Sequence, residues 1–274
     1  MAFALYDTTE SCTPMVFWED HPLWEQVAET LCVKRAHPVA VFLDNPSKDS
    51  LRALVHLRGL ECLVIRHGEF DSEAIAAIGA LRQLKSLDAT FRCNDEQGVS
   101  DHFARLKHLR YVRLHCDDLE TNGLACLATM PALERVEIYS TKISDEGVAH
   151  ACSPPRLEVL TIVGARRITG RTLSVLRHRS EFRTLNLAHS SVNASGMRAI
   201  ASVRQMQSVS ISPTQVDADA VQRLQEALPH CRISIACVWG DDEMYEQCRQ
   251  VADQVGLFSY MDDREAGKYQ GLRW

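Results

Sequence analysis

Two short segments in the middle of the chain combine aromatic, cationic and acidic side chains at a regular spacing. These side chains alternate with apolar residues, and they are Tyr111, Arg113, His115, Arg135, Glu137 and Tyr139. Such alternation is typical of a strand that buries one face, so the polar members of each segment point to the other face. Tyrosine and arginine dominate the binding energy of many interfaces, because each supplies a large contact area and directional hydrogen bonds. The pattern therefore indicates the chemistry of surface recognition.

Corresponding positions in two earlier segments hold Arg66 and Asp88. We call the complete set the central patch, and it consists of Arg66, Asp88, Tyr111, Arg113, His115, Arg135, Glu137 and Tyr139. An alternative interpretation is that Arg113, Arg135 and Glu137 form only a solvated set of ion pairs across strands, worth about 0.2–1 kcal/mol per pair. Tyrosines are an unusual choice for solvation alone, so the sequence favours an interaction site.

Motifs for catalysis are missing from the sequence. It contains no G-x-S-x-G, no glycine-rich phosphate loop and no H-E-x-x-H. Cys116 is adjacent to His115, Asp117 and Asp118, which together have the composition of a nucleophile and its base. Consecutive residues at a strand end point in different directions, however, so this run does not predict a catalytic site. We expect no enzyme activity and no cofactor.

The ten cysteines show no spacing typical of metal binding. There is no C-x-x-C pair, and the dipeptide His115-Cys116 lacks a second pair of ligands at a zinc-like spacing. The first residues lack a basic segment, and Asp7 interrupts the early apolar run, so no signal peptide is predicted. We therefore expect a cytoplasmic protein with reduced cysteines and no metal site.

The composition is that of an ordinary folded protein, with 46% hydrophobic and 24% charged residues. The formal net charge of -6 provides no general attraction to phosphate groups, so we expect no nucleic-acid partner. No window approaches 18 uninterrupted apolar residues, so we expect no membrane-spanning segment.

The two segments that carry the tyrosines belong to a repeat of 24 or 25 residues. Each copy contains two apolar positions separated by one residue, and the first of each pair is Leu63, Leu87, Val112, Val136, Leu160, Leu185, Val209 or Ile233. Val39 and Val41 occupy the same two positions one period earlier. The pattern predicts nine short strands, each with one buried face.

About ten residues after each strand the apolar spacing changes to that of a helix, as in Val148 and Ala151. Residues that favour helix N-caps stand just before several of these segments: Ser47, Asp71, Asp95, Ser144, Thr169, Asn193 and Asp217. In the sequence ISDEGV, which begins at Ile143, we expect Ile143 to fill a core position and Ser144 to cap the helix that follows. The corresponding residue Glu120 is not a preferred cap.

The segments MPALERVEIYSTKISDEGV and LEVLTIVGARRITGRTL resemble the leucine-rich repeat family. They are similar to bacterial repeats of about 24 residues with I-T-D-A-G-L and to the helix-bearing repeats of ubiquitin-ligase substrate receptors. The resemblance covers about Val39 to Ile235. One departure is that the loop position of the family's asparagine ladder holds Gly68, Arg92, Asp117, Thr141, Ala165, Ser190 and Thr214.

The resemblance implies an α/β fold, a right-handed solenoid bent into an arc, with about nine parallel strands on the inner face and short helices on the outer face. We expect an N-terminal helical cap in residues 1–36, the repeat array in 37–236, and a capping helix with a tail in 237–274. Asp20 and Pro22 suit the start of the first cap helix. Val251 and Val255 belong to the apolar face of the last one.

The family resemblance implies a non-catalytic module that binds a protein partner through its inner face. An alternative is a substrate-selecting adaptor or effector of a larger complex such as a ubiquitin ligase, although residues 1–36 lack the leucine-proline start of such receptors. A third is a structural protein without a specific partner. The strands alone offer on the order of 500 Å², below the roughly 800 Å² of a standard interface, so loops such as 67–69 or the C-terminal segment should contribute. The oligomeric state is left open.

Overall fold

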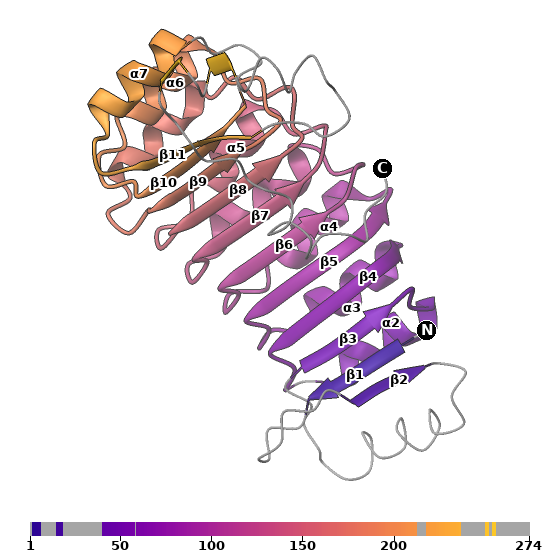
Figure 1. The fold of residues 1–274 in the computed structure, drawn as a ribbon. Helices are drawn as coiled ribbons and strands as arrows, with labels where there is room; N and C mark the ends of the chain where they lie inside the picture. The colour runs from indigo at the N-terminus through magenta and orange to yellow at the C-terminus, as the bar shows by residue number, and fades with distance from the viewer. Residues whose placement is uncertain are drawn as a thin grey trace.

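The computed structural model describes residues 2–6, 15–18, 40–57, 59–212, 218–236, 250–251 and 254–255. Nine of its strands lie parallel in one open sheet, in chain order from β3 to β11 (Figure 1). They are β3 (Ala40–Asp44), β4 (Cys62–Phe70), β5 (Ser86–Cys93), β6 (Tyr111–His115), β7 (Arg135–Tyr139), β8 (Val159–Val163), β9 (Thr184–Leu187), β10 (Ser208–Ile211) and β11 (Arg232–Ile235). The nine predicted strands are confirmed, but the prediction for the first was wrong in its register. Val41 and Leu43, not Val39 and Val41, pair with Leu63 and Ile65, because the first repeat is two residues shorter than the 24-residue period.

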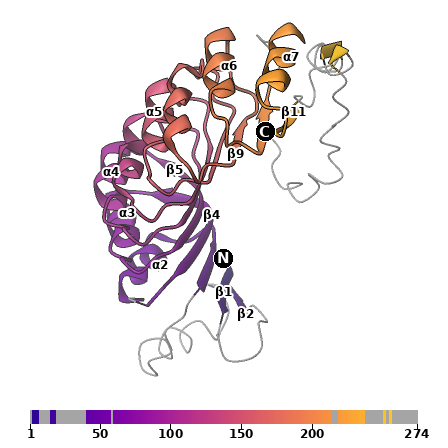
Figure 2. The same ribbon diagram turned by 90° about the vertical axis from the view of Figure 1, so that its left-hand side faces the viewer.

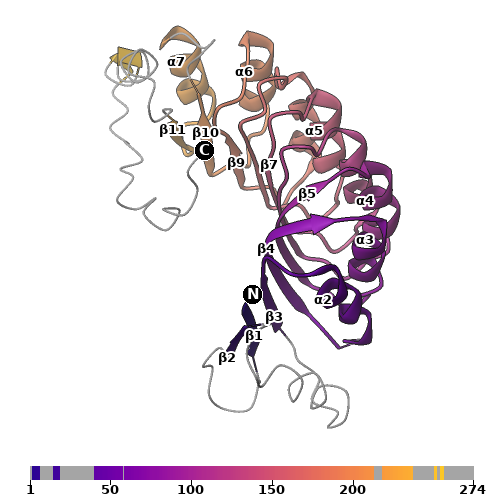
Figure 3. The same ribbon diagram turned by 90° about the vertical axis from the view of Figure 1, so that its right-hand side faces the viewer.

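A helical segment follows most strands before the chain returns to the sheet. The α-helices are α2 (Lys48–Ala53), α3 (Ser72–Gly79), α4 (Glu96–Phe103), α5 (Asp145–Ala151), α6 (Ala194–Ala201) and α7 (Ala218–Ala227). The 3-10 helices are η1 (Leu54–His56), η2 (Asn122–Thr129) and η3 (Arg171–His178). Seen from two sides, the strands line the inner face of an arc and the helices lie on its outer face (Figures 2 and 3).

The core lies between the sheet and the helices. Equivalent apolar residues pair across neighbouring strands, as in Leu63 with Leu87 and Val136 with Leu160. All four of these side chains are inaccessible to solvent. Because one repeat cannot bury its own apolar edges, stacking of neighbours stabilises all the copies together.

Four predicted N-caps accept a backbone N–H from the first turn of their helix, and they are Ser47, Asp71, Asp95 and Asn193. The prediction for Ser144 was wrong in its chemistry: it stands at the N-cap of α5, but its hydroxyl lies 2.8 Å from the hydroxyl of Thr121 and does not cap the helix. The Thr121 hydroxyl of the neighbouring repeat is thus the hydrogen-bond partner of Ser144, in place of a backbone N–H of α5. Asp217 lies outside the described residues.

Asp145 in the same ISDEGV segment joins two repeats. Its buried carboxylate accepts hydrogen bonds from the backbone N–H groups of Thr169 and Gly170, at 3.0 and 2.9 Å, and from the Thr169 hydroxyl. Thr169 is therefore not a helix cap, and Gly170 holds that position before η3 with a φ of 86°. Glycine tolerates this left-handed conformation without steric strain.

The ends of the array differ from the expected caps where the structure describes them. β1 (Ala2–Tyr6) and β2 (Met15–Trp18) form an antiparallel pair that extends the sheet beyond β3, which the sequence did not predict. The helix expected from Asp20 lies outside the described residues, as does most of the C-terminal cap. Val251 and Val255 do pack against the core. No helix in the described ranges is long and apolar enough to cross a membrane.

Candidate functional site

The eight residues of the central patch lie together on four neighbouring strands, β4 to β7. Three pairs face each other directly across β6 and β7: Tyr111 with Arg135, Arg113 with Glu137, and His115 with Tyr139. On the other side of β6, Asp88 of β5 is the direct neighbour of Arg113. All eight alternate with buried core positions, so the shared register places them on the inner face.

A chain of ion pairs runs across the four strands. Both guanidinium NH groups of Arg66 donate to the Asp88 carboxylate, at 2.8 and 3.1 Å. Arg113 lies between two acids, with Nη1 3.3 Å from Asp88 and Nη2 2.7 Å from Glu137. Charge-assisted pairs with two donors fix side-chain geometry as well as adding energy. The charges of Arg66, Asp88, Arg113 and Glu137 therefore compensate one another.

Burial distinguishes these pairs from solvated ones. The side chains of Asp88 and Glu137 are each only 12% exposed, and that of Arg113 is 25% exposed. The expected ion pair of Arg113 with Glu137 is present, but neither acid is fully solvated, and Arg135 forms no ion pair within the described part of the chain. Arg135 is exposed. Its positive charge is therefore the one charge of the patch that lacks an ionic partner in these residues.

Aromatic rings lie on both sides of the ion-pair chain. The Arg113 guanidinium lies 5.9 Å from the centre of the Tyr111 ring, and the His115 and Tyr139 rings are 5.7 Å apart with a 44° tilt. Burial is the main cause that raises the pKa of Tyr111, with the Glu137 charge adding to it. Burial also lowers the pKa of His115. At neutral pH the patch therefore presents a neutral phenol and a neutral imidazole beside one exposed cation.

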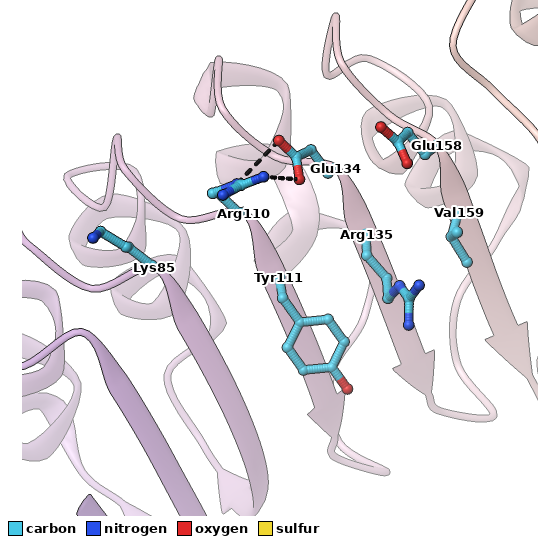
Figure 4. A pocket seen from close by; sticks show the side chains of 7 residues that line it. All are labelled: Lys85, Arg110, Tyr111, Glu134, Arg135, Glu158 and Val159. Atoms are coloured by element: carbon cyan, nitrogen blue, oxygen red, sulfur yellow. Dashed lines mark hydrogen bonds and ion pairs between the residues drawn. The ribbon is translucent and has the colours of Figure 1, made fainter. Parts of the chain in front are cut away.

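A hollow of about 380 Å³ lies where strands β5 to β8 begin. Its lining consists of Lys85, Arg110, Tyr111, Glu134, Arg135, Glu158 and Val159. Figure 4 shows the Arg110 guanidinium joined to Glu134 while Arg135 extends toward the inner face beside Val159. Tyr111 and Arg135 thus belong both to the central patch and to this hollow. We name this feature the amino-terminal hollow.

A second hollow, of about 320 Å³, lies where β4 to β6 end, and residues 67–69 contribute to it together with His115. The register of β4 and β5 shifts between Ile65 and Gly68. His67 has a φ of 55° there, and its ring nitrogen lies 3.0 Å from the Asp44 carboxylate. An irregularity of this kind redirects side chains at the end of a strand.

The rim of the amino-terminal hollow was not predicted from the sequence. Four charged residues of the rim each stand one residue before a strand: Lys85, Arg110, Glu134 and Glu158. They therefore recur with the same 24- or 25-residue spacing as the core positions. That column was the signal that could have identified them. Their closeness to Tyr111 follows only from the direct pairing of the strands.

The described residues offer little for catalysis or metal binding. Cys116 is 1% exposed, and burial raises the pKa of its thiol to about 11, which opposes formation of a nucleophilic thiolate. Cys126 and Cys152 are likewise buried, with their pKa values raised to about 12. Within the described ranges no group of three or more histidine, cysteine or acidic side chains could hold a metal ion. The six cysteines described are free.

No protein-family model and no curated protein matches the sequence. Among solved structures, internalin C2 from Listeria monocytogenes is similar at 14% identity and a TM-score of 0.42, over 58% of this chain and 74% of that one.

Two receptor structures are also similar. One is the leucine-rich repeat ectodomain of the Arabidopsis receptor kinase HAESA with a peptide hormone, at 14% identity and a TM-score of 0.47, over 71% of this chain and 32% of that one. The other is a TLR13–ssRNA13 complex, at 14% identity and a TM-score of 0.46, over 68% of this chain and 27% of that one. The chain therefore spans about a third or less of these receptor chains.

The fold class follows from the chain's own repeat. Each copy has the leucine-rich pattern, buries its paired apolar positions, and adds one parallel strand to the inner face of the arc. The segment after the strand leads to a helix on the outer face, which is the architecture that the family resemblance implied. The described repeat array is a leucine-rich repeat solenoid.

Proposed function

We propose that this protein is a non-catalytic binding module that recognises a protein partner through the central patch. The observation that carries the proposal is the combination of Tyr111, Tyr139 and exposed Arg135 beside a set of ion-paired residues. We call this set the ion-paired floor, and it consists of Arg66, Asp88, Arg113 and Glu137. The floor residues hold one another in place, so little side-chain freedom remains to be lost when a partner binds. Rigid aromatic and arginine side chains are the groups that contribute most to interfaces.

The shape of the surface supports the same proposal. The strands alone offer less area than the roughly 800 Å² that a standard interface takes from each partner. The two hollows continue the patch at both ends of the strands, and residues 67–69 line one of them. A partner that spans the inner face and reaches into both hollows would therefore bury more area than the strands alone offer. We expect this contact to take place in the cytoplasm.

The adaptor alternative needs a segment that docks onto other machinery. Its candidate segments are residues 1–36 and 237–274, of which only 2–6, 15–18, 250–251 and 254–255 belong to the described structure. No contact of these residues favours the adaptor function, so the binding module remains the proposal.

The test is capture of partners from the native cell extract by wild type and by a triple variant, Tyr111→Ala with Arg135→Ala and Tyr139→Ala. Arg113 is left in place, because its removal would leave the buried acids Asp88 and Glu137 short of a cation. We expect a protein that wild type retains to be reduced at least about tenfold with the variant, since interface anchors of this type each contribute about 2 kcal/mol or more.

A matched control carries three substitutions at exposed positions of the outer helices, Glu146→Ala, Arg198→Ala and Gln222→Ala. It should retain the partner as wild type does. Thermal unfolding of all three proteins shows whether a loss of capture reflects the surface and not the fold. Equal recovery by wild type and the triple variant, with both folded, would place the binding site away from the central patch and contradict the proposal.

A further inference from the structure

Charge is distributed unequally between the two edges of the sheet. The connections that lead from a helix to the start of strands β5 to β11 are residues 80–85, 104–110, 130–134, 152–158, 179–183, 202–207 and 228–231. They contain nine lysine and arginine residues and three acidic residues. Because all these strands are parallel, their starts lie along one edge, which we call the amino-terminal edge.

The opposite edge has the reverse balance. Connections from a strand to the next helix, at residues 71, 94–95, 116–121, 140–144, 164–170 and 188–193, contain five acidic residues and three cations. The net charge of -6 for the whole chain therefore hides a basic amino-terminal edge.

Part of the basic edge has a structural explanation. Lys107, Arg179 and Arg204 donate hydrogen bonds to backbone carbonyls at the ends of helical segments in neighbouring repeats, at 2.7 to 3.3 Å. Cations are favourable there because the carbonyl end of a helix is partially negative. Lys85 and Arg110 are paired with Glu61 and Glu134. A carbonyl contact satisfies donors but leaves the positive charge of the side chain in place.

Arg183 likewise donates to backbone carbonyls, those of Ser180 and Phe182, so three arginines of the edge remain. Arg82 and Arg105 are exposed and form no ion pair within the described ranges, and Arg156 reaches only Glu134, at 3.7 Å. These three arginines come from the connections before β5, β6 and β8, so they are spread along the edge. Exposed positive charge in such a row attracts a negatively charged partner.

The basic edge is continuous with the central patch through the amino-terminal hollow. Lys85 and Arg110 line the hollow from the edge, and Tyr111 and Arg135 line it from the inner face (Figure 4). A chain that lies on the central patch and leaves it past the starts of the strands therefore crosses the connections that carry the exposed arginines.

We propose that the partner presents an acidic polypeptide segment, which crosses the amino-terminal hollow and lies along the basic edge. This inference rests on the proposed function and adds the chemistry of the partner. Carboxylate side chains meet Arg135 in the hollow and then Arg82, Arg105 and Arg156 outside it. Complementary charge of this kind speeds encounter and fixes orientation more than it adds affinity.

Acidic protein fits the edge better than nucleic acid does. Glu134 and Glu158 line the hollow between the cations, and they would repel an unbroken row of phosphates. A polypeptide can place its carboxylates beside arginines and leave neutral residues beside these two acids. Of the two described edges of the sheet, a second copy of this chain offers only the weakly acidic opposite edge as a complement, so a separate acidic partner is favoured.

The test measures binding of a fluorescent oligoglutamate peptide to the full chain by anisotropy at low salt. Serine residues separate the glutamates of this peptide, so that neutral residues can lie beside Glu134 and Glu158. The edge variant carries Arg82→Glu, Arg105→Glu and Arg156→Glu. The matched control carries Arg166→Glu, Arg167→Glu and Arg198→Glu, which are also exposed and change the net charge equally. We expect the edge variant to bind the peptide at least about tenfold more weakly and the control to change by less than about threefold, because close charges act more strongly than distant, screened ones.

Several results would overturn the inference. Absence of peptide binding by wild type, or an equal loss in the edge variant and the control, would show that the edge has no specific role. Tighter binding of an oligouridylate of equal charge would favour nucleic acid, and salt-dependent self-association abolished by the edge variant would favour a second copy.

The peptide test is separate from the capture test. The edge variant retains Tyr111, Arg135 and Tyr139, so failure of oligoglutamate binding with successful, patch-dependent capture removes only the edge inference. Oligoglutamate binding at the edge without patch-dependent capture contradicts the proposed function instead.

Discussion

Leu160→Asp is expected to unfold the repeat array as a whole. Leu160 is inaccessible to solvent in β8, and its neighbours in β7 and β9 are the buried residues Val136 and Leu185. A carboxylate at this position would be buried among apolar side chains. The free-energy cost of burying an unpaired charge, several kcal/mol, is comparable with the total stability of a folded domain, roughly 5–15 kcal/mol. Because each repeat is stabilised by its neighbours, the damage extends beyond one strand.

Far-ultraviolet circular dichroism and thermal unfolding measure this effect. The control is Val163→Asp in the same strand, where the half-buried side chain belongs to the inner-face set and a charge can reach water. We expect the control to keep most of the wild-type spectrum. A folded Leu160→Asp protein with an unchanged unfolding temperature would mean that the assigned register of β8 is wrong.

Arg113→Met is expected to have the second largest effect, a loss of about 2 kcal/mol in the free energy of unfolding. Arg113 contacts both Asp88 and Glu137, and the two carboxylates are mostly buried. Arg66 still pairs with Asp88 after the substitution, whereas Glu137 loses the cation that hydrogen-bonds to it. The cost therefore comes chiefly from an uncompensated charge at Glu137.

A double variant separates this charge effect from lost packing. Arg113→Met combined with Glu137→Gln removes both charges, so we expect it to recover about half of the loss seen in the single variant. Denaturant unfolding of wild type, both single variants and the double variant gives the coupling energy. If the losses in the free energy of unfolding were additive, Arg113 and Glu137 would not stabilise each other. That result would contradict the ion pair assigned to them.

The repeat made the fold predictable from the sequence. From β4 onward the two apolar positions in each copy recur every 24 or 25 residues, and the paired strands have the register that this spacing requires. Because one face must be buried, a slip by one residue would expose the whole apolar set. The inner-face placement of Tyr111, Arg113 and Tyr139 followed from the same constraint.

Features that depend on side-chain competition were not predictable. Ser144 has the ideal type for an N-cap, yet its hydroxyl pairs with that of Thr121, which is far away in the sequence. Asp145 was assigned no role, although its carboxylate joins two repeats. These outcomes depend on distances between repeats, and such distances are set by packing and not by residue type.

The partner contacts of the candidate site were only partly predictable for the same reason. The sequence identified the charged members of the central patch but not which of them pair, so it could not show that Arg135 is the one left without an ionic partner in the described residues. It pointed to residues 67–69, which line the second hollow, but not to the hollows themselves, because the distances between the loops at their rims are set by the pairing of the strands.

The most direct test of the central claim is site-specific photo-cross-linking of the captured partner. A photoreactive phenylalanine replaces Tyr139 on the inner face, and in a matched protein it replaces Arg198 on the outer helix α6. We expect a cross-linked partner from position 139 and none from position 198, because a partner on the central patch lies within contact of β7. Cross-linking from position 198 but not from position 139 would show that the partner binds the outer face, and it would contradict the account.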